Sequence, residues 1–186
     1  DTPLDITLTA SDVDSTALTF AALPPAHGTL SAITNTTCTV GTDGVSSACS
    51  AHVTYTPDAN YNGPDSFFFT ANDGPHGIEL WESNGTSTGT QLVDDIVSGS
   101  GSASILNPTA VGNLLFFSAN DGTHGTELWE SDGTSSGTVL VDDIAAGTTS
   151  SSPTNLTNVG GTLFFSANDA THGTELWTSD GTSTGT

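Results

Sequence analysis

Apolar and polar residues alternate along much of this 186-residue chain. In the segment LDITLTA, Leu4, Ile6 and Leu8 fall on one side, and Asp and Thr residues fall on the other. The segment HVTYT places Val53 and Tyr55 in the same way. A period of two over short stretches, bounded by Gly, Pro, Asn and Asp, is typical of strands in antiparallel sheets. No segment has the apolar spacing of an amphipathic helix, so the sequence predicts an all-β fold.

A second, much longer period marks the later part of the chain. The string SANDGTHGTELWESDGTSSGT begins at Ser118, and close copies begin at Thr70 and Ser166. A fixed period of this size is typical of repeat architectures, and four short strands in about 45 residues is the size of one propeller blade. Residues that recur every 48 positions include three Trp, three His and three Phe residues: Trp81, Trp129, Trp177, His76, His124, His172, Phe68, Phe116 and Phe164.

Two family resemblances rest on these segments. The motifs ELWESNGT, ELWESDGT and ELWTSDGT resemble the ELWxxDGT repeat of large bacterial surface proteins, which implies propeller-like β-structure. The segments DTPLDITLTASDVDSTALTF, PPAHGTL and VTYTPDANYNGPDSFFFTANDG resemble the cadherin-like tandem repeat of bacterial adhesins, which implies an immunoglobulin-like sandwich. Such domains usually begin with a further strand ahead of DTP, and we expect that strand to be supplied in trans. Both resemblances imply adhesion, surface display or long extracellular stalks, and neither implies an enzyme.

The sequence therefore predicts two domains. We expect a cadherin-like or Ig-like β-sandwich over residues 1–73, followed by two and a half propeller-blade-like antiparallel hairpin repeats of period 48 over residues 66–186. The segment SFFFTANDG belongs to both resemblances, so we expect a shared boundary strand and a stiff rod. Closed propellers usually need four or more blades, so the partial set indicates either a longer protein or strands from neighbouring molecules.

The charge of the chain limits the classes of partner that it can bind. It has 21 acidic residues and neither Lys nor Arg, which gives a formal net charge of -21. Nucleic-acid binding is disfavoured because Lys and Arg neutralise the phosphates, and chemistry that needs a lysine is excluded. An anionic membrane surface would repel the chain, and it has no apolar run of about 18 residues for membrane insertion. Hard cations, above all calcium, are the natural counter-partners because they prefer carboxylate and carbonyl oxygens.

The cysteines and the glycosylation sequons indicate an oxidising, extracellular or cell-surface location. Cys38 and Cys49 flank a Gly-rich loop centred on Asp-Gly, which favours a local disulfide across a hairpin; two free thiols are the alternative. Closing so short a loop would stabilise the fold by about 2–3 kcal/mol in the chain-entropy treatment. The candidate glycosylation sites, each followed at the second position by Thr, are Asn35, Asn84 and Asn155.

Candidate chemistry gathers at the repeated turn NDGxHG, NDATHG in the third copy, and at the carboxylates on either side of it. The His residue is a metal ligand, a general base or a turn residue, and the residues around it tolerate positive φ, which favours the turn. We expect the paired carboxylates on solvent-facing loops, where calcium binding suits them better than glycosidase chemistry. The cadherin-like resemblance implies a calcium-binding turn at Asp12 and Asp14, with a solvated turn as the alternative. The candidate calcium ligands are Asp12, Asp14, Asp73, Glu79, Asp121, Glu127, Asp169 and Glu175.

Two further motifs have a structural and a functional interpretation. In VDDI, at Val93–Ile96 and Val141–Ile144, one Asp must face the inner side of the pleat unless a bulge turns it outward. Capping of a strand end is favoured there over a cation site. In ELW, Leu and Trp point to opposite faces, so both faces of each repeat carry apolar groups. That arrangement favours packing between repeats or subunits over a glycan-binding surface.

Together these observations predict a non-enzymatic, extracellular structural or adhesive protein. It would be the subunit of a surface fibre or a segment of a large adhesin, with itself as partner in a head-to-tail homopolymer. Assembly would proceed through β-strand addition and repeat stacking. The alternative is a calcium-dependent carbohydrate-binding module whose exposed Trp side chains bind glycans. An enzyme is least favoured, because no catalytic triad or acid–base pair can be assembled, and Ca²⁺ is the one cofactor considered.

Overall fold

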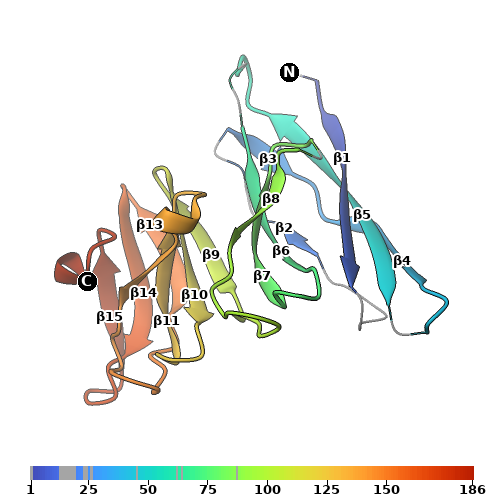
Figure 1. Cartoon of the computed structure of the whole chain (residues 1–186). Coiled ribbons are helices and arrows are strands. Elements are labelled where there is room, and N and C mark those ends of the chain that lie inside the picture. The colour runs from blue at the N-terminus through green and yellow to red at the C-terminus, as the bar shows by residue number, and fades with distance from the viewer. Residues whose placement is uncertain are drawn as a thin grey trace. The chain divides into compact units, whose positions relative to one another are not determined.

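A computed structural model describes residues 2–12, 20–22, 25, 27–44, 46–61, 63, 65–86 and 88–186. The described elements are fifteen β-strands in antiparallel sheets and two short 3-10 helices (Figure 1). The predicted all-β fold is therefore confirmed. The chain forms two compact units, Asp1–Gly101 and Ser102–Thr186, and each is described by itself below.

The described residues of the first unit form two four-stranded sheets, as expected of an Ig-like sandwich. One sheet has the order β1-β5-β3, with β4 also pairing with β5: β1 (Leu4–Asp12), β3 (Gly28–Leu30), β4 (Thr34–Val40) and β5 (Ser47–Pro57). The other sheet has the order β2-β6-β7-β8: β2 (Ala21–Ala22), β6 (Phe67–Asn72), β7 (Ile78–Ser83) and β8 (Thr90–Asp94).

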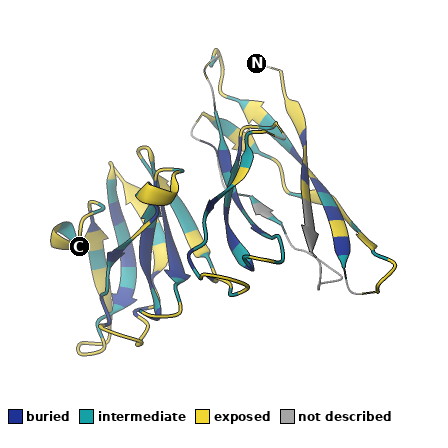
Figure 2. Ribbon diagram, in the orientation of Figure 1, coloured by how far each residue is buried: buried dark blue, intermediate teal, exposed yellow. Residues whose placement is uncertain are grey.

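The alternating pattern of the sequence builds the core of this sandwich. Ile6 and Leu8 of β1 and Val53 of β5 are buried in one cluster with Phe67 and Phe69 of β6. Their neighbours along each strand are more exposed, as the alternating colours of Figure 2 show. One face of each sheet therefore packs against the other, and the opposite faces carry the polar residues of the pattern.

The first unit extends further along the chain than the sandwich expected over residues 1–73. β6 pairs with β7 along its whole length, from Phe67 opposite Ser83 to Asn72 opposite Ile78, and β8 pairs with β7. A boundary at residue 73 would separate strands that share one continuous set of hydrogen bonds. The first copy of the repeated motif is thus part of the sheet that contains β2 and β6.

The second unit consists of a four-stranded and a three-stranded sheet. The first has the order β12-β11-β10-β9: β9 (Leu106–Val111), β10 (Leu114–Asn120), β11 (Thr126–Ser131) and β12 (Val139–Asp142). The second has the order β13-β14-β15: β13 (Thr154–Val159), β14 (Thr162–Asn168) and β15 (Thr174–Ser179). The 3-10 helices η1 (Ser135–Gly137) and η2 (Ser183–Gly185) follow β11 and β15.

The two sheets of the second unit share one hydrophobic core. Phe116 and Leu128 of the four-stranded sheet lie in the same buried cluster as Leu163 and Phe165 of the three-stranded sheet. Ile144, which follows β12, belongs to the same cluster. The sheets therefore pack face to face, with apolar side chains between them.

Three hairpins in the structure pair their strands in the same register. They are β6–β7, β10–β11 and β14–β15, and each matches the next when 48 is added to the residue numbers. Each places a Phe opposite a Trp: Phe69 and Trp81, Phe117 and Trp129, Phe165 and Trp177. The local structure of the motif is therefore the same in all three places, although its surroundings differ.

Candidate functional site

The repeated NDGTHG turn is organised by a contact between an aspartate and a histidine. Asp121 Oδ1 accepts hydrogen bonds from the backbone N–H groups of Thr123 and His124, both at 2.8 Å. Its Oδ2 lies 2.7 Å from Nδ1 of the His124 ring. Asn120 Oδ1 accepts a further bond, from the N–H of Gly122 at 2.7 Å. The carboxylate therefore holds the turn between β10 and β11 through several bonds to its own backbone.

The same contact recurs at the other two turns, between Asp73 and His76 at 2.7 Å and between Asp169 and His172 at 2.6 Å. The hydrogen bond to the aspartate raises the pKa of each of the three histidines above its usual range. Hydrogen bonds from His172 and the backbone lower the pKa of Asp169 to about 2. In each turn the aspartate therefore favours the charged form of the imidazole beside it.

Two glutamates of the motif lie inside the protein, which corrects the expectation of solvent-facing carboxylates. Glu79 and Glu127 are both 0% exposed. Glu127 accepts hydrogen bonds from the N–H of Ile144 at 3.1 Å, the N–H of Ser151 at 2.8 Å and the hydroxyl of Ser151 at 2.5 Å. Burial raises the pKa of Glu127, and the hydrogen bonds from Ser151 and Ile144 oppose that effect. The side chain thus fastens the loop after β12 onto β11.

Glu79 has the corresponding position in the first unit. It accepts hydrogen bonds from the backbone N–H groups of Ile96 at 3.2 Å and Val97 at 3.4 Å, in the loop after β8. Glu175, the third member of the set, is exposed on β15. In two of the three hairpins, the glutamate of the motif therefore binds the backbone of a loop and holds it in place. The sequence did not reveal this role, because the donors lie 17 to 24 residues further along the chain.

The loops held by these glutamates also contact the His turns. Gly125 has φ +73, and a Cβ at this position would lie 2.5 Å from the carbonyl oxygen of Thr149. Gly77, with φ +68, is covered in the same way by the backbone of Gly101. Gly173 has φ +85, and nothing lies within 4 Å of the place its Cβ would take. Glycine is required at the first two turns by both conformation and space.

A second recurring turn, with the sequence SDGTSSGT in the middle copy, directs the chain into β12. The hydroxyls of Ser131 and Thr138 lie 2.8 Å apart, and Thr138 Oγ1 donates to the carbonyl of Thr134 at 2.9 Å. Asp132 Oδ1 accepts from the N–H and the hydroxyl of Thr134. Corresponding bonds join Ser83 to Thr90 and Ser179 to Thr186. These serines and threonines were missed by the sequence analysis, although their fixed offsets were a usable signal.

The aspartates of VDDI act at the end of a strand. The pairing of β11 with β12 shifts register between Leu128 and Trp129, which places a bulge in VDDI. Asp143 Oδ2 accepts a hydrogen bond from the N–H of Gly147 at 2.9 Å, and Asp95 Oδ2 accepts one from Gly99 at 3.3 Å. These bonds fit the capping interpretation of the motif.

The tryptophans pack within their sheets. Trp129 is 8% exposed, which leaves little of its ring for a ligand. The Trp81 ring centroid lies 6.3 Å from that of Phe69, and the Trp177 centroid lies 6.5 Å from that of Phe165. These contacts support the packing interpretation over a glycan platform.

The cysteines, the sequons and the first acidic pair lie apart from these turns. Cys38 of β4 and Cys49 of β5 stand opposite each other and form a disulfide with an S–S distance of 2.01 Å. Asp12 is the last residue of β1, its side chain is outside the described part, and Asp14 lies outside the described residues. All three candidate glycosylation sites are exposed: Asn35, Asn84 and Asn155.

The candidate calcium ligands do not gather into one centre in the described part of the chain. Among the described residues, no group of three or more His, Cys, Asp or Glu side chains is placed to hold a metal ion. Asp73, Asp121 and Asp169 bind the turn histidines, whereas Glu79 and Glu127 bind loop backbone. Calcium binding by these residues stays a prediction. The described residues also include no helix with the length and apolar character needed to span a bilayer.

A cavity of about 420 Å³ lies in the first unit. The Tyr55 hydroxyl at its wall lies 2.8 Å from Asp65 Oδ2 and 3.1 Å from the carbonyl oxygen of His27. Burial and the neighbouring Asp65 raise the pKa of Tyr55 to about 12, so the phenol stays neutral. The bond ties β5 to the segment before β6. Other lining residues include Ile6, Tyr61, Phe67 and Asn84.

Comparison with known families gives a match for the first half of the chain. The family model for the bacterial Ig domain matches residues 1–94, and the chain belongs to this family. The match ends at Asp94, the last residue of β8, so it includes the strands that complete the second sheet of the sandwich. Bacterial Ig-like domains typically occur in surface proteins and are typically non-enzymatic. Neither the curated proteins nor the solved structures contain a match to the chain.

Proposed function

We propose that this chain is a non-enzymatic structural or adhesive element of an extracellular surface protein. It serves as the subunit of a surface fibre or as a segment of a large adhesin. The chain associates with itself head to tail, through stacking of sheets and addition of β-strands. Membership of the bacterial Ig domain family supports the surface location and the absence of catalysis.

One observation carries this proposal: the recurring polar side chains of the motif bind the chain's own backbone. Asp121 holds the His turn, Glu127 holds the loop after β12, and Asp132 holds the turn that enters β12. Residues of a catalytic or ligand-binding site instead leave donors or acceptors directed at a substrate. These side chains are therefore best explained as structural contacts that hold the turns and the loop in place.

The packing of the second unit supports assembly by stacking. Its two sheets bury Phe116 and Leu128 against Leu163 and Phe165, so each hairpin contributes one layer, and the hairpins act as propeller-blade-like repeats. On the far side of the last layer, Leu176 is 75% exposed. An exposed leucine on a sheet face is a site where a further layer gains buried apolar area.

Sedimentation velocity of the purified chain tests this function. We expect the weight-average sedimentation coefficient to rise with concentration, because head-to-tail contacts do not close on themselves. Salt that screens the net charge of -21 should strengthen the association. A single species of monomer mass at every concentration and salt level would contradict self-assembly.

A further inference from the structure

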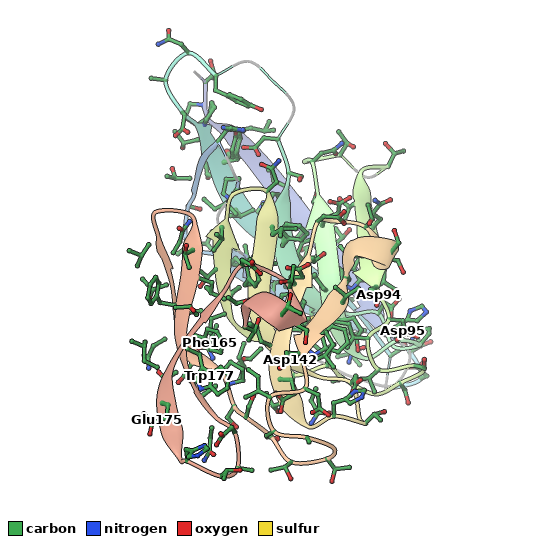
Figure 3. All side chains as sticks on the ribbon, turned by 90° about the vertical axis from the view of Figure 1, so that its left-hand side faces the viewer. Asp94, Asp95, Asp142, Phe165, Glu175 and Trp177 are labelled. Atoms are coloured by element: carbon green, nitrogen blue, oxygen red, sulfur yellow. A yellow bond between two sulfur atoms is a disulfide. The ribbon has the colours of Figure 1, made fainter. Side chains whose placement is uncertain are left out.

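The turn that leads out of β7 carries an asparagine where its two later copies carry an aspartate. The sequences are Asn84-Gly-Thr, Asp132-Gly-Thr and Asp180-Gly-Thr. The first two of these turns lead into β8 and β12, whose last residues, Asp94 and Asp142, are labelled in Figure 3. One position of the motif thus has an amide in the first copy and a carboxylate in the others.

All three side chains use one oxygen to hold the turn. Asp132 Oδ1 accepts hydrogen bonds from the N–H of Thr134 at 2.9 Å and from its hydroxyl at 2.7 Å. The third copy makes the same pair of bonds. Asn84 Oδ1 accepts the corresponding bonds from Thr86, at 3.1 and 2.7 Å. The amide oxygen of Asn84 therefore takes the place of a carboxylate oxygen.

The amide nitrogen of Asn84 is not needed by the turn. Within the described part of the chain, Nδ2 of Asn84 makes no hydrogen bond. A group attached to this nitrogen leaves the carbonyl oxygen in place, so both bonds from Thr86 would be kept. Asn84 is exposed, as are Asp132 and Asp180 in the other copies, whereas the preceding Ser83 is 1% exposed. The serine therefore anchors the turn, and the asparagine side chain lies in solvent.

The sequon at Asn155 is bonded within its own sheet. Asn155 Nδ2 donates to Ser166 Oγ at 3.1 Å, and its carbonyl oxygen accepts from the Thr157 hydroxyl at 2.9 Å. Asn107, one repeat earlier, makes the corresponding two contacts, both at 3.4 Å. Pro108 follows Asn107 and excludes a sequon there. The asparagine and the threonine therefore serve the irregular pairing of these strands, with or without a sequon.

The sequon at Asn35 lies at a similar irregularity. The φ values of Asn35 and Asn155 are 54° and 56°. The pairing of β4 with β5 shifts register between Thr34 and Thr37, and Thr37 Oγ1 lies 3.1 Å from Ser50 Oγ. The threonine of this sequon, which a transferase must also recognise, is thus held by the sheet. At both sites a strand has to open locally before a transferase can bind.

The turn at Asn84 imposes no such requirement. Thr86 Oγ1 donates to Asn84 Oδ1 and accepts from the N–H of Gly89, and both partners belong to the same turn. A transferase can therefore bind the Asn-Gly-Thr sequence while β7 and β8 stay paired.

We propose that Asn84 is the residue that carries an N-linked sugar, and that Asn35 and Asn155 stay unmodified. The donor is a sugar whose anomeric carbon bears a diphosphate. Asn84 Nδ2 forms a bond to that carbon, the bond from the carbon to the diphosphate oxygen breaks, and the electron pair leaves with the diphosphate. A base of the transferase takes one proton from Nδ2. Such a modification suits the proposed surface location and is independent of self-association.

The test presents the intact chain to UDP-glucose and a soluble asparagine glucosyltransferase that modifies free peptides of all three sequons. We expect glucose on Asn84 at a rate at least about tenfold above that on Asn35 or Asn155, because local opening must come first at those two sites. Mass spectrometry locates the sugar after cleavage beside Asp and Glu, since the chain has no Lys or Arg. No glucose on Asn84, or equal rates at the three residues, would overturn the inference.

Two substitutions separate the effect of the turn from that of the sequon. Asp132→Asn creates a sequon in the second copy of the turn, and we expect a second glucose there, because Asn84 already makes the same turn bonds. Pro108→Ala creates a sequon at Asn107, which should react as slowly as Asn155 because it has the same strand contacts. The opposite outcome for either variant would also overturn the inference. Circular dichroism checks that each variant keeps its β-structure.

Self-association and this modification can fail separately. A chain that sediments as a monomer but takes glucose on Asn84 has the modification site and lacks self-assembly. A chain that self-associates but takes no glucose on Asn84 leaves the proposed function intact and shows that the modification site is wrong.

Discussion

Ser151 donates both its backbone N–H and its hydroxyl to the buried carboxylate of Glu127, at 2.8 and 2.5 Å. The two residues are 24 positions apart, and the contact closes the loop that begins after β12. A third donor, the N–H of Ile144, binds the same carboxylate. A buried charge is tolerated when several donors replace the water that it loses. Glu127 therefore holds two segments of the chain together.

Glu127→Ala should strongly destabilise the second unit. The substitution leaves the N–H groups of Ile144 and Ser151 buried without an acceptor, and we expect a loss of about 3 kcal/mol in the free energy of unfolding. Urea denaturation measures this loss. Glu175→Ala is the matched control, because Glu175 occupies the same place in the motif on an exposed strand and should change stability by less than about 0.5 kcal/mol. Equal losses of stability in the two variants would contradict the role of Glu127 in holding the loop.

The turn glycines offer a second matched pair. Gly125 and Gly173 both have positive φ, so alanine costs about 1 kcal/mol at each for conformation alone. At Gly125 the new Cβ also meets the carbonyl of Thr149 at 2.5 Å, whereas at Gly173 the space is open. We therefore expect Gly125→Ala to lower the free energy of unfolding by at least about 1 kcal/mol more than Gly173→Ala. If the two variants unfold at the same urea concentration, the loop does not cover Gly125.

The Asp121–His124 contact should be strongest at mildly acid pH. The hydrogen bond with Asp121 raises the pKa of His124, so its contribution is complete below the unfolded histidine pKa and is lost as pH rises through the folded value. Burial favours the neutral form of Asp121, but bonds from His124 and Thr123 outweigh it and lower the pKa. That contribution is complete above the unfolded aspartate pKa and is lost as pH falls through the folded value. The window runs from about pH 4 to about pH 6.5.

Substitution of Asp121 by Asn tests this contact directly. The pKa of His124 should fall toward its usual range, because the amide cannot stabilise the imidazolium as a carboxylate does. An NMR titration of the imidazole protons measures the change. His172 serves as the internal control, since its pKa is raised by Asp169 and should not move. An unchanged His124 titration in Asp121→Asn would show that the turn does not depend on the pair.

Calcium should have little effect on thermal stability if hydrogen bonds to the aspartates already hold the turns. Asp121 already accepts three hydrogen bonds, and an ionised carboxylate has about four lone-pair positions. We expect the midpoint of thermal unfolding to differ by less than about 2 °C between calcium and a chelator, which is the size of a small stability change in a domain. A large stabilisation by calcium that Asp121→Ala abolishes would instead support the predicted calcium site.

The alternation of the sequence was enough to predict the strands and their inward faces. Ile6 and Leu8 are buried as the period of two requires, and the recurring Asp, Gly and His residues form turns. These features depend on neighbours a few residues apart. Nothing at that range distinguishes Leu128 from Leu176, because Leu128 is buried by side chains that lie more than ten residues later in the chain, among them Val141 and Phe165.

Long-range contacts also explain the domain boundary and the glutamates. The first copy of the motif looks like the later two, yet β7 and β8 complete a sheet of the Ig-like sandwich through β6. Glu79 and Glu127 occupy polar positions of an alternating strand, which favours exposure. Their donors include Ile96 and Ile144, which lie 17 residues further along the chain at the end of the VDDI motif. Local pattern therefore predicts the elements, and distant loops decide which polar side chains are buried.

Electron microscopy of the purified chain shows whether the chain assembles with itself. We expect head-to-tail filaments or particles longer than one chain, and Leu106→Asp, which changes an exposed leucine away from β15, should leave them intact. Substitution of the exposed Leu176 by Asp should shorten or abolish them, because it places a charge on the face where the next layer packs. Dispersed single chains in every preparation would contradict self-assembly.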